Sequence, residues 1–108
     1  MSDMHALVAI VERGQADRIV DKAKEQGAGG ATIFYARGTG QEEFKRFFHH
    51  LQVDSSKEVI LIVVTEEQLP RIMKAVVEAG ALDKPGKGIA FTLPVSNLVG
   101  LEYRNGLR

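Results

Sequence analysis

The sequence predicts an α+β sandwich in which two helices cover one face of a four-stranded antiparallel sheet. Short apolar runs and amphipathic helical patterns follow one another in the order strand, helix, strand, strand, helix, strand, which corresponds to two βαβ halves. A length of 108 residues, with 44% apolar and 26% charged residues, is typical of one globular domain. We therefore expect residues 1–108 to form a single ferredoxin-like domain, the name given to this split βαβ arrangement.

The first strand and the first helix are predicted within residues 5–27. Residues 5–11 form an apolar, β-branched run that is too short for a helix and is followed by a polar stretch ending at Gly14. From Gln15 the apolar residues recur at the spacing of one helix face, and Gly27 closes the pattern. The residues of this face are Ala16, Ile19, Val20 and Ala23.

A second strand is predicted over residues 31–37, and it stops at Gly38 and Gly40. Residues 41–57 are less regular, because aromatic residues at near-helical spacing are mixed with two histidines and a turn-like Asp-Ser-Ser sequence. We interpret this segment as a long excursion with some helical character. Its apolar side chains either pack on the domain itself or form a surface for a partner protein. The candidate partner-binding residues are Phe44, Phe47 and Phe48.

The strongest strand pattern covers residues 58–64, whose unbroken apolar content predicts a central strand of the sheet. Thr65 and Gln68 then have the spacing of a capping box at the start of the second helix, which ends at Gly80. Pro70 would remove an intrahelical hydrogen bond if Thr65 were the N-cap residue. The helix is therefore expected to begin one turn later or with a tight first turn.

The last strand is predicted over residues 89–93 and ends at Pro94, after a Gly- and Pro-containing loop that carries Lys84 and Lys87. Both helices then cover the same face of the sheet, and the Val, Ile and Phe side chains of the other face are left uncovered. A small monomer seldom exposes a large apolar surface to water. We therefore expect a homo-oligomer in which copies of the chain cover this face.

Composition argues against several functional classes. The chain has 14 Lys plus Arg and 14 Asp plus Glu, and this zero net charge argues against a general binder of nucleic acid or anionic membranes. Without cysteine, the chain has no disulfides, cysteine-based zinc sites or thiol nucleophiles. The longest apolar run, residues 59–64, is far shorter than the roughly 18 residues of a membrane-spanning helix, and the N-terminus lacks a leader pattern. We expect a cytoplasmic protein without direct membrane insertion.

Little in the sequence points to catalysis. The histidines His5, His49 and His50 have no recognisable catalytic frame, so no enzymatic activity is expected. His49 and His50 point in different directions on any helix or strand. They would need a third ligand, such as Asp54 or Glu43, to hold a metal ion, and no metal site is predicted.

Two glycine loops are candidates for binding a small anion. Glycine lets backbone N–H groups approach an anion closely, and neighbouring lysines add positive charge. A bend or bulge beside a strand is the alternative interpretation, and neither loop has the spacing of a nucleotide-binding fingerprint. The candidate ligand-binding residues are Gly38, Gly40, Lys84, Gly86, Lys87 and Gly88.

These loops lie within a longer resemblance to the PII signal-transduction superfamily, which spans residues 7–101. Residues 86–95 resemble the family's B-loop and following strand, where Gly-Asp-Gly-Lys leads through an apolar strand to Pro-Val. Residues 30–40 are similar to the strand that ends in the family's Gly-x-Gly before its T-loop. Residues 59–79 resemble the strand and helix between the T-loop and the B-loop.

The resemblance implies an assembly and a function. PII-like proteins are compact trimers of ferredoxin-like subunits that bind adenine nucleotides such as ATP, ADP or AMP in clefts between neighbours. They contact a transporter, enzyme or regulator through the T-loop. By this resemblance the two glycine loops line an intersubunit cleft, residues 41–57 are the T-loop, and the protein is a signal-transduction regulator of the nitrogen regulatory P-II type. Ligand binding would shift the T-loop between conformations.

The chain departs from the family pattern at the phosphate clamp. Lys87 stands in place of the B-loop acid and Ile89 in place of its lysine, and the two arginines that follow Pro-Val in typical members fall on Gly100 and Glu102. The family's three cationic groups are therefore missing from these positions. The T-loop is short and has no tyrosine, so the uridylylation known in some members has no acceptor there. The resemblance indicates a divergent member with a short T-loop.

Three other functions fit the same fold. A CutA-like trimer that binds divalent ions would use His49 and His50, and a metal-dependent thermal shift would favour it. An acylphosphatase-like enzyme needs an arginine-bearing loop and a catalytic asparagine, and Asn97 and Asn105 lie in no such frame. The third alternative is an oligomeric scaffold without a ligand.

Overall fold

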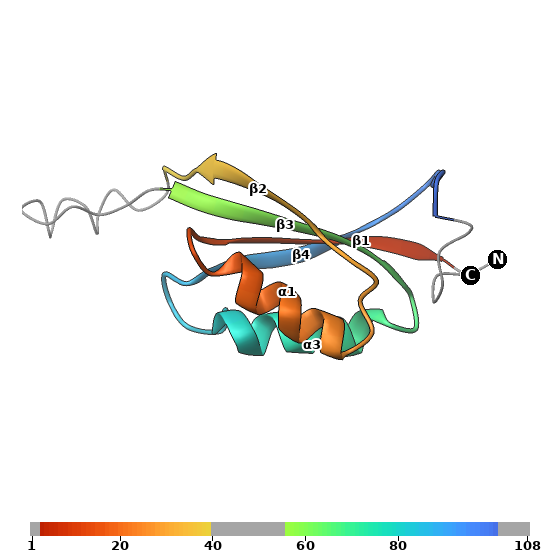
Figure 1. The fold of residues 1–108 in the computed structure, drawn as a ribbon, viewed down its shortest axis with the longest axis horizontal. Coiled ribbons are helices and arrows are strands. Elements are labelled where there is room, and N and C mark those ends of the chain that lie inside the picture. Colours follow the sequence, from red (N-terminus) through yellow and green to blue (C-terminus); the bar gives the residue numbers. More distant parts are fainter. Residues whose placement is uncertain (1–2, 40–55, 102–108) are drawn as a thin grey trace, which may run out of the picture.

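The computed structural model describes residues 3–39 and 56–101 of the chain. Over these residues the elements follow the predicted order of strand, helix, strand, strand, helix, strand (Figure 1). They are β1 (Met4–Glu12), α1 (Ala16–Glu25), β2 (Thr32–Arg37), β3 (Ser56–Thr65), α3 (Leu69–Gly80) and β4 (Gly88–Pro94). Both helices lie against the same face of one sheet (Figure 1), so the predicted ferredoxin-like α+β fold is confirmed.

The strands are antiparallel neighbours in the order β2-β3-β1-β4, and β3 is an interior strand, as predicted. One row of paired residues crosses the whole sheet, and it consists of Tyr35, Glu58, Val11 and Gly88. This row lies near the end of β2, the start of β3, the end of β1 and the start of β4. The chain segments that continue from these four strand ends therefore share one end of the sheet.

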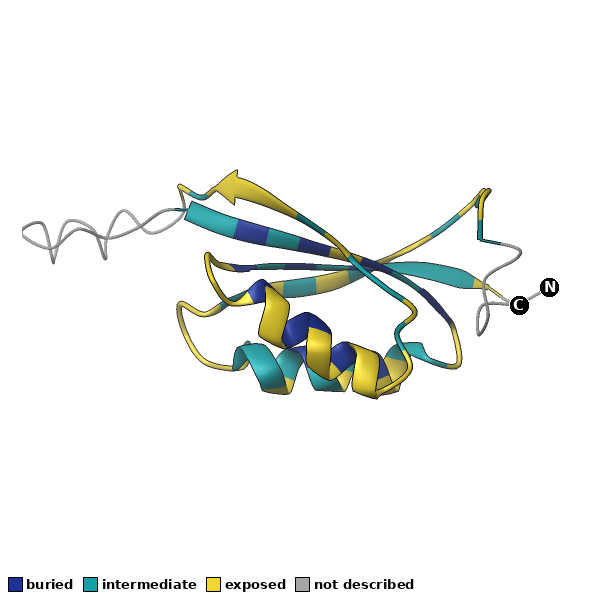
Figure 2. Ribbon diagram, in the orientation of Figure 1, coloured by how far each residue is buried: buried dark blue, intermediate teal, exposed yellow. Residues whose placement is uncertain are grey.

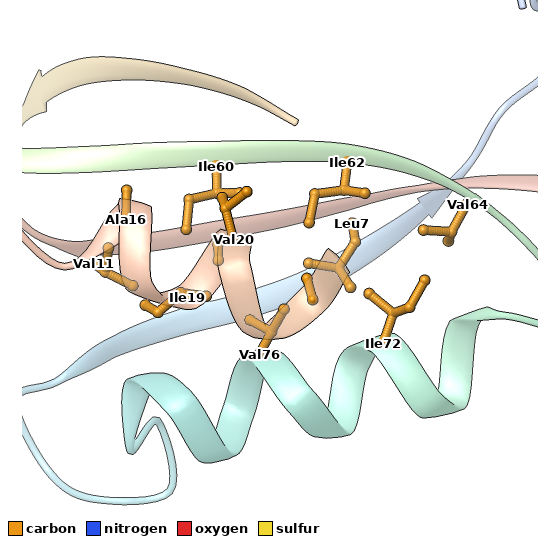
Figure 3. Packing of buried hydrophobic residues seen from close by; sticks show 12 residues of the cluster. Leu7, Val11, Ala16, Ile19, Val20, Ile60, Ile62, Val64, Ile72 and Val76 are labelled. Atoms are coloured by element: carbon orange, nitrogen blue, oxygen red, sulfur yellow. The ribbon is translucent and has the colours of Figure 1, made fainter. Parts of the chain in front are cut away.

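The core lies between the sheet and the helices. Alternate residues of β1 and β3 point toward the helices, as the two-residue period of a strand requires. They pack against Ile19 of α1 and against Ile72 and Val76 of α3 (Figure 3). The fully buried strand residues are Leu7, Ala9, Val11, Ile60, Ile62 and Val64. The other residues in the apolar run of β3 lie on the face that the helices leave uncovered.

The start of α3 combines a capping box with a proline. The Gln68 backbone N–H donates to Thr65 Oγ1 at 3.2 Å, and the Thr65 N–H donates to Gln68 Oε1 at 3.0 Å. The helix nevertheless begins at Leu69, with Pro70 in its first turn. A proline is tolerated there because the first N–H groups of a helix have no intrahelical partner. The predicted later start of the helix is confirmed.

Ala81 ends α3 in a left-handed backbone conformation, with φ of 52° and ψ of 42°. This conformation costs a residue with a Cβ about 1–2 kcal/mol, whereas glycine adopts it freely. We expect Ala81→Gly to raise the free energy of unfolding by about 0.5–1 kcal/mol, after the greater flexibility of glycine in the unfolded chain is subtracted. Urea denaturation of the two proteins measures this difference.

Ala75 provides the matched control, because it lies inside α3. Ala75→Gly is expected to lower the free energy of unfolding by about 1 kcal/mol, the usual cost of glycine within a helix. Equal losses of stability in both variants would contradict the assignment of Ala81 as a strained helix end.

Candidate functional site

The sheet face opposite the helices is apolar and exposed in a single chain. Ile89 and Leu93 of β4 are 57% and 51% exposed, and Phe34 of β2 is 49% exposed. Figure 2 shows that both edge strands are exposed or half-buried along their length. Two adjacent rows of paired residues cross this face: Thr32, Leu61, Val8 and Phe91, then Phe34, Val59, Ile10 and Ile89. Only one residue of these two rows is polar, so the predicted uncovered apolar face is present.

The first glycine loop begins where β2 ends. Gly38 lies beside the side chain of Lys57, since a Cβ built at position 38 would be 2.8 Å from Lys57 Cε. Glycine therefore lets the lysine stem cross the chain at the end of β2. Lys57 was not predicted as a site residue, because its contact with Gly38 depends on the pairing of β2 with β3.

The second glycine loop leads into β4. Gly86 and Gly88 have positive φ angles of 78° and 136°. A Cβ built on Gly88 would overlap the carbonyl oxygen of Ile10 in the neighbouring strand β1. Lys84 and Lys87 of the same loop are exposed. The loop thus presents two lysines on a backbone path that only glycine allows at position 88.

The two glycine loops do not meet within one chain. β2 and β4 are the two edges of the sheet, so Gly38 and Gly88 are at least three strand spacings, or about 14 Å, apart. Both loops nevertheless lie at the same end of the sheet (Figure 1). A site that uses both loops on one compact anion therefore requires a second copy of the chain.

Part of the predicted site falls on residues that are not described. Outside the described residues lie Gly40, Phe44, Phe47, Phe48, His49 and His50. Ser56 and Lys57 belong to β3, and Ser56 pairs with Arg37 of β2. The excursion predicted over residues 41–57 was therefore two residues too long at its end. Serine and lysine are weak strand formers, and it is their pairing with β2 that makes them part of the strand.

The turn between β1 and α1 contains further polar contacts that the sequence did not reveal. The buried carboxylate of Glu58, 7% exposed, accepts hydrogen bonds at Oε1 from the N–H groups of Gly14 (2.8 Å) and Ala16 (2.9 Å). The Arg13 guanidinium lies 4.7 Å from the centroid of the Tyr35 ring. The sequence contained one indication that Glu58 is buried. It lies two and four residues before Ile60 and Ile62, and therefore on the same side of the strand as these core residues.

The described residues give no support to a metal site. Within residues 3–39 and 56–101, no group of three His, Cys, Asp or Glu side chains is placed to hold a metal ion. His5 Nε2 is buried and, in this part of the chain, has no hydrogen-bond partner. The helices among these residues are all too short or too polar to cross a membrane.

Two comparisons with known proteins agree with this geometry. The sequence model of the family described as nitrogen regulatory protein P-II matches residues 4–104. Among solved structures, the fold is similar to that of PII from Arabidopsis thaliana bound to citrate, with a TM-score of 0.72 and 24% sequence identity. That match covers 97% of this chain and 87% of the Arabidopsis chain, and at this identity it shows the shared fold. Because the family model covers nearly all of the sequence, the chain belongs to the nitrogen regulatory protein P-II family, whose members are signalling regulators.

Proposed function

We propose that the chain is a homotrimeric, non-enzymatic regulator that acts in the cytoplasm. In this proposal each copy is one domain, and the uncovered sheet faces meet inside the trimer. A small anionic ligand binds in the clefts between neighbouring copies. The segment that follows Gly40 contacts a target protein, such as a transporter or an enzyme. Membership of the P-II family supports this proposal, since P-II proteins are trimeric signalling regulators that act on protein targets.

The observation that carries the proposal is the position of the two glycine loops relative to the uncovered apolar face. Gly38 and the loop 86–88 lie at the same end of the sheet but on opposite edges. When uncovered faces pack around a symmetry axis, the β4 edge of one copy can meet the β2 edge of its neighbour. Trimer formation would then bury the apolar face and complete the cleft in one step.

The basic residues beside these loops favour an anionic ligand. Lys57 packs against Gly38, and Lys84 and Lys87 lie in the loop before β4. In a chain of zero net charge, such a local excess of cations attracts anions to one end of the sheet. We propose that these lysines replace the cationic groups that the chain lacks at the family's clamp positions. Adenine nucleotides are the first ligand class to test, and citrate belongs in the same test because the Arabidopsis relative holds it.

Light scattering and a thermal-shift panel test the proposal together. The purified chain is measured alone and with ATP, ADP, AMP, cyclic nucleotides, 2-oxoglutarate, citrate, bicarbonate or divalent cations. We expect the mass of a trimer and a higher melting temperature with an adenine nucleotide, since a ligand at 100 times its Kd stabilises the folded state by about 2.7 kcal/mol. A monomer would overturn the assembly, and a folded trimer that no anion stabilises would overturn the ligand site.

Lys87→Gln tests the charge of the second loop. Lys87 is exposed, so its removal should leave folding unchanged while it weakens the binding of the stabilising anion by about three- to tenfold. The matched control is Lys74→Gln, which removes an exposed lysine from the outer side of α3. Titration of the anion into both variants by calorimetry measures the two Kd values. An equal Kd in both would show that Lys87 makes no contribution to the site.

A further inference from the structure

The turn between β1 and α1 is fastened to both strands that border the first glycine loop. The Arg13 N–H donates to the Ser56 carbonyl oxygen of β3 at 3.3 Å, and the Arg13 guanidinium stacks on Tyr35 of β2. Glu58 of β3 accepts two hydrogen bonds from the same turn and from the first residue of α1. We name Arg13, Tyr35 and Glu58 the clasp.

Within the clasp, Glu58 also caps the N-terminus of α1, although it lies 42 residues away in the sequence from Ala16, the first residue of the helix. The Gln15 side chain, at the N-cap position, does not cap α1 and instead accepts a hydrogen bond from the Arg18 guanidinium at 2.7 Å. A carboxylate at the N-terminus of a helix is favoured by the helix dipole, and its bonds to N–H groups are stronger than those of a neutral acceptor. A buried carboxylate also needs these donors, because burial without partners is costly. The position of the turn is therefore strongly tied to β3.

The same turn follows directly on the part of β1 that contacts the second glycine loop. Val11 pairs with Gly88, and the carbonyl oxygen of Ile10 lies so close to Gly88 that no side chain fits between them. A movement of the loop 86–88 must therefore displace the end of β1 or break this pairing. The end of β1 also pairs with β3, and β3 with β2, and the clasp adds side-chain contacts to this backbone pairing.

We propose that the clasp mechanically couples the two glycine loops within each copy of the chain. A change in the loop 86–88 moves the end of β1, and Arg13 and Glu58 pass that movement to the ends of β2 and β3 on either side of the first loop. The inference rests on the proposed function in one respect, since it takes the two loops as parts of the ligand site. The coupling itself is a property of the protein without ligand.

Coupling is established by measuring the response at one end to a change at the other. The full chain is labelled with ¹⁵N, and the amide signals of Gly14, Gly38 and Gly88 serve as reporters, with no ligand added. Gly86→Ala perturbs the second loop, because Gly86 has a φ of 78° that alanine adopts with strain. We expect the Gly38 signal to shift at least about threefold more than those of Gly27 and Gly100, which lie away from the clasp.

The same perturbation is then made in chains in which one member of the clasp is changed. In Glu58→Ala, Gly86→Ala should still shift the Gly88 signal, but the response of Gly38 should fall by at least about half, and the remainder is carried by the backbone pairing of β1 with β3 and of β3 with β2. Arg13→Met gives a second test that does not disturb the buried carboxylate, and Glu58→Gln, which keeps one acceptor oxygen, should retain more coupling than Glu58→Ala. An unchanged Gly38 signal in the parent chain, or an equal response with and without the clasp, would overturn the proposal. Because these spectra are recorded without ligand, a failure of the protein to bind nucleotides would not change the result of this experiment.

Discussion

Replacing Gly88 with alanine is expected to lower the free energy of unfolding by about 3–5 kcal/mol, the largest loss of any single methyl addition that we predict. Gly88 combines a φ of 136°, which L-residues rarely adopt, with a backbone contact to Ile10 that leaves no room for a Cβ. The obstacle is a carbonyl oxygen within the β1–β4 ladder, so it cannot rotate away as a side chain would. Relief of the overlap requires the start of β4 to separate from β1.

Gly30 is the matched control for Gly88. No atom outside its immediate chain neighbours lies within 4 Å of a Cβ built at Gly30, and its φ falls outside the positive range. Gly30→Ala should therefore leave the free energy of unfolding unchanged or raise it by up to about 1 kcal/mol through reduced flexibility of the unfolded chain. Urea denaturation of both variants at equal protein concentration provides the comparison. A Gly88→Ala variant as stable as Gly30→Ala would contradict the described pairing of β1 with β4.

The fold followed from the sequence because its signals are local. The apolar spacing of Ile19 and Val20 and the unbroken run in β3 each identify an element without reference to any distant residue. The start of α3 was also predictable, since Pro70 acts on its own turn. The start of β3 was placed two residues too late because Ser56 is a strand residue only through its pairing with Arg37. Such pairing is a property of the folded sheet, and residues 56 and 57 carry no periodicity that indicates it.

The candidate site was predictable only in part, because some of its contacts join residues that are far apart in the sequence. Gly86 and Gly88 could be identified from the sequence because glycines in a loop indicate backbone conformations that other residues avoid, and both have positive φ angles in the structure. Their separation from Gly38 follows from the strand order, which places β2 and β4 on opposite edges. The contribution of Glu58 was missed, because it depends on hydrogen bonds that span 42 and 44 residues of sequence. A charged residue at the start of an apolar strand is usually solvated, and here it is the burial of its side chain that reveals its partners.

Replacing Leu61 with glutamate is expected to convert the proposed trimer into monomers. Leu61 lies on an interior strand of the uncovered face, between Thr32 and Val8, and is 37% exposed in a single chain. In the monomer a glutamate at this position reaches water, but in the trimer three carboxylates would be buried without partners. A cost of several kcal/mol per carboxylate lowers the association constant by at least about a thousandfold. Light scattering should therefore show the mass of one chain, with the helical circular dichroism retained.

Lys74→Glu is the control that shows whether trimer formation responds to a buried carboxylate or only to a change in net charge. This substitution makes a larger change in net charge, but it lies on the exposed side of α3 in the helical layer. If assembly covers the apolar sheet face, Lys74→Glu should remain a trimer under conditions in which Leu61→Glu is monomeric, because only the latter buries its carboxylate. If Leu61→Glu kept the trimeric mass, the subunits would have to meet through another surface. The two glycine loops would then no longer be brought together by burial of this face, and a cleft built from neighbouring copies would lose its structural basis.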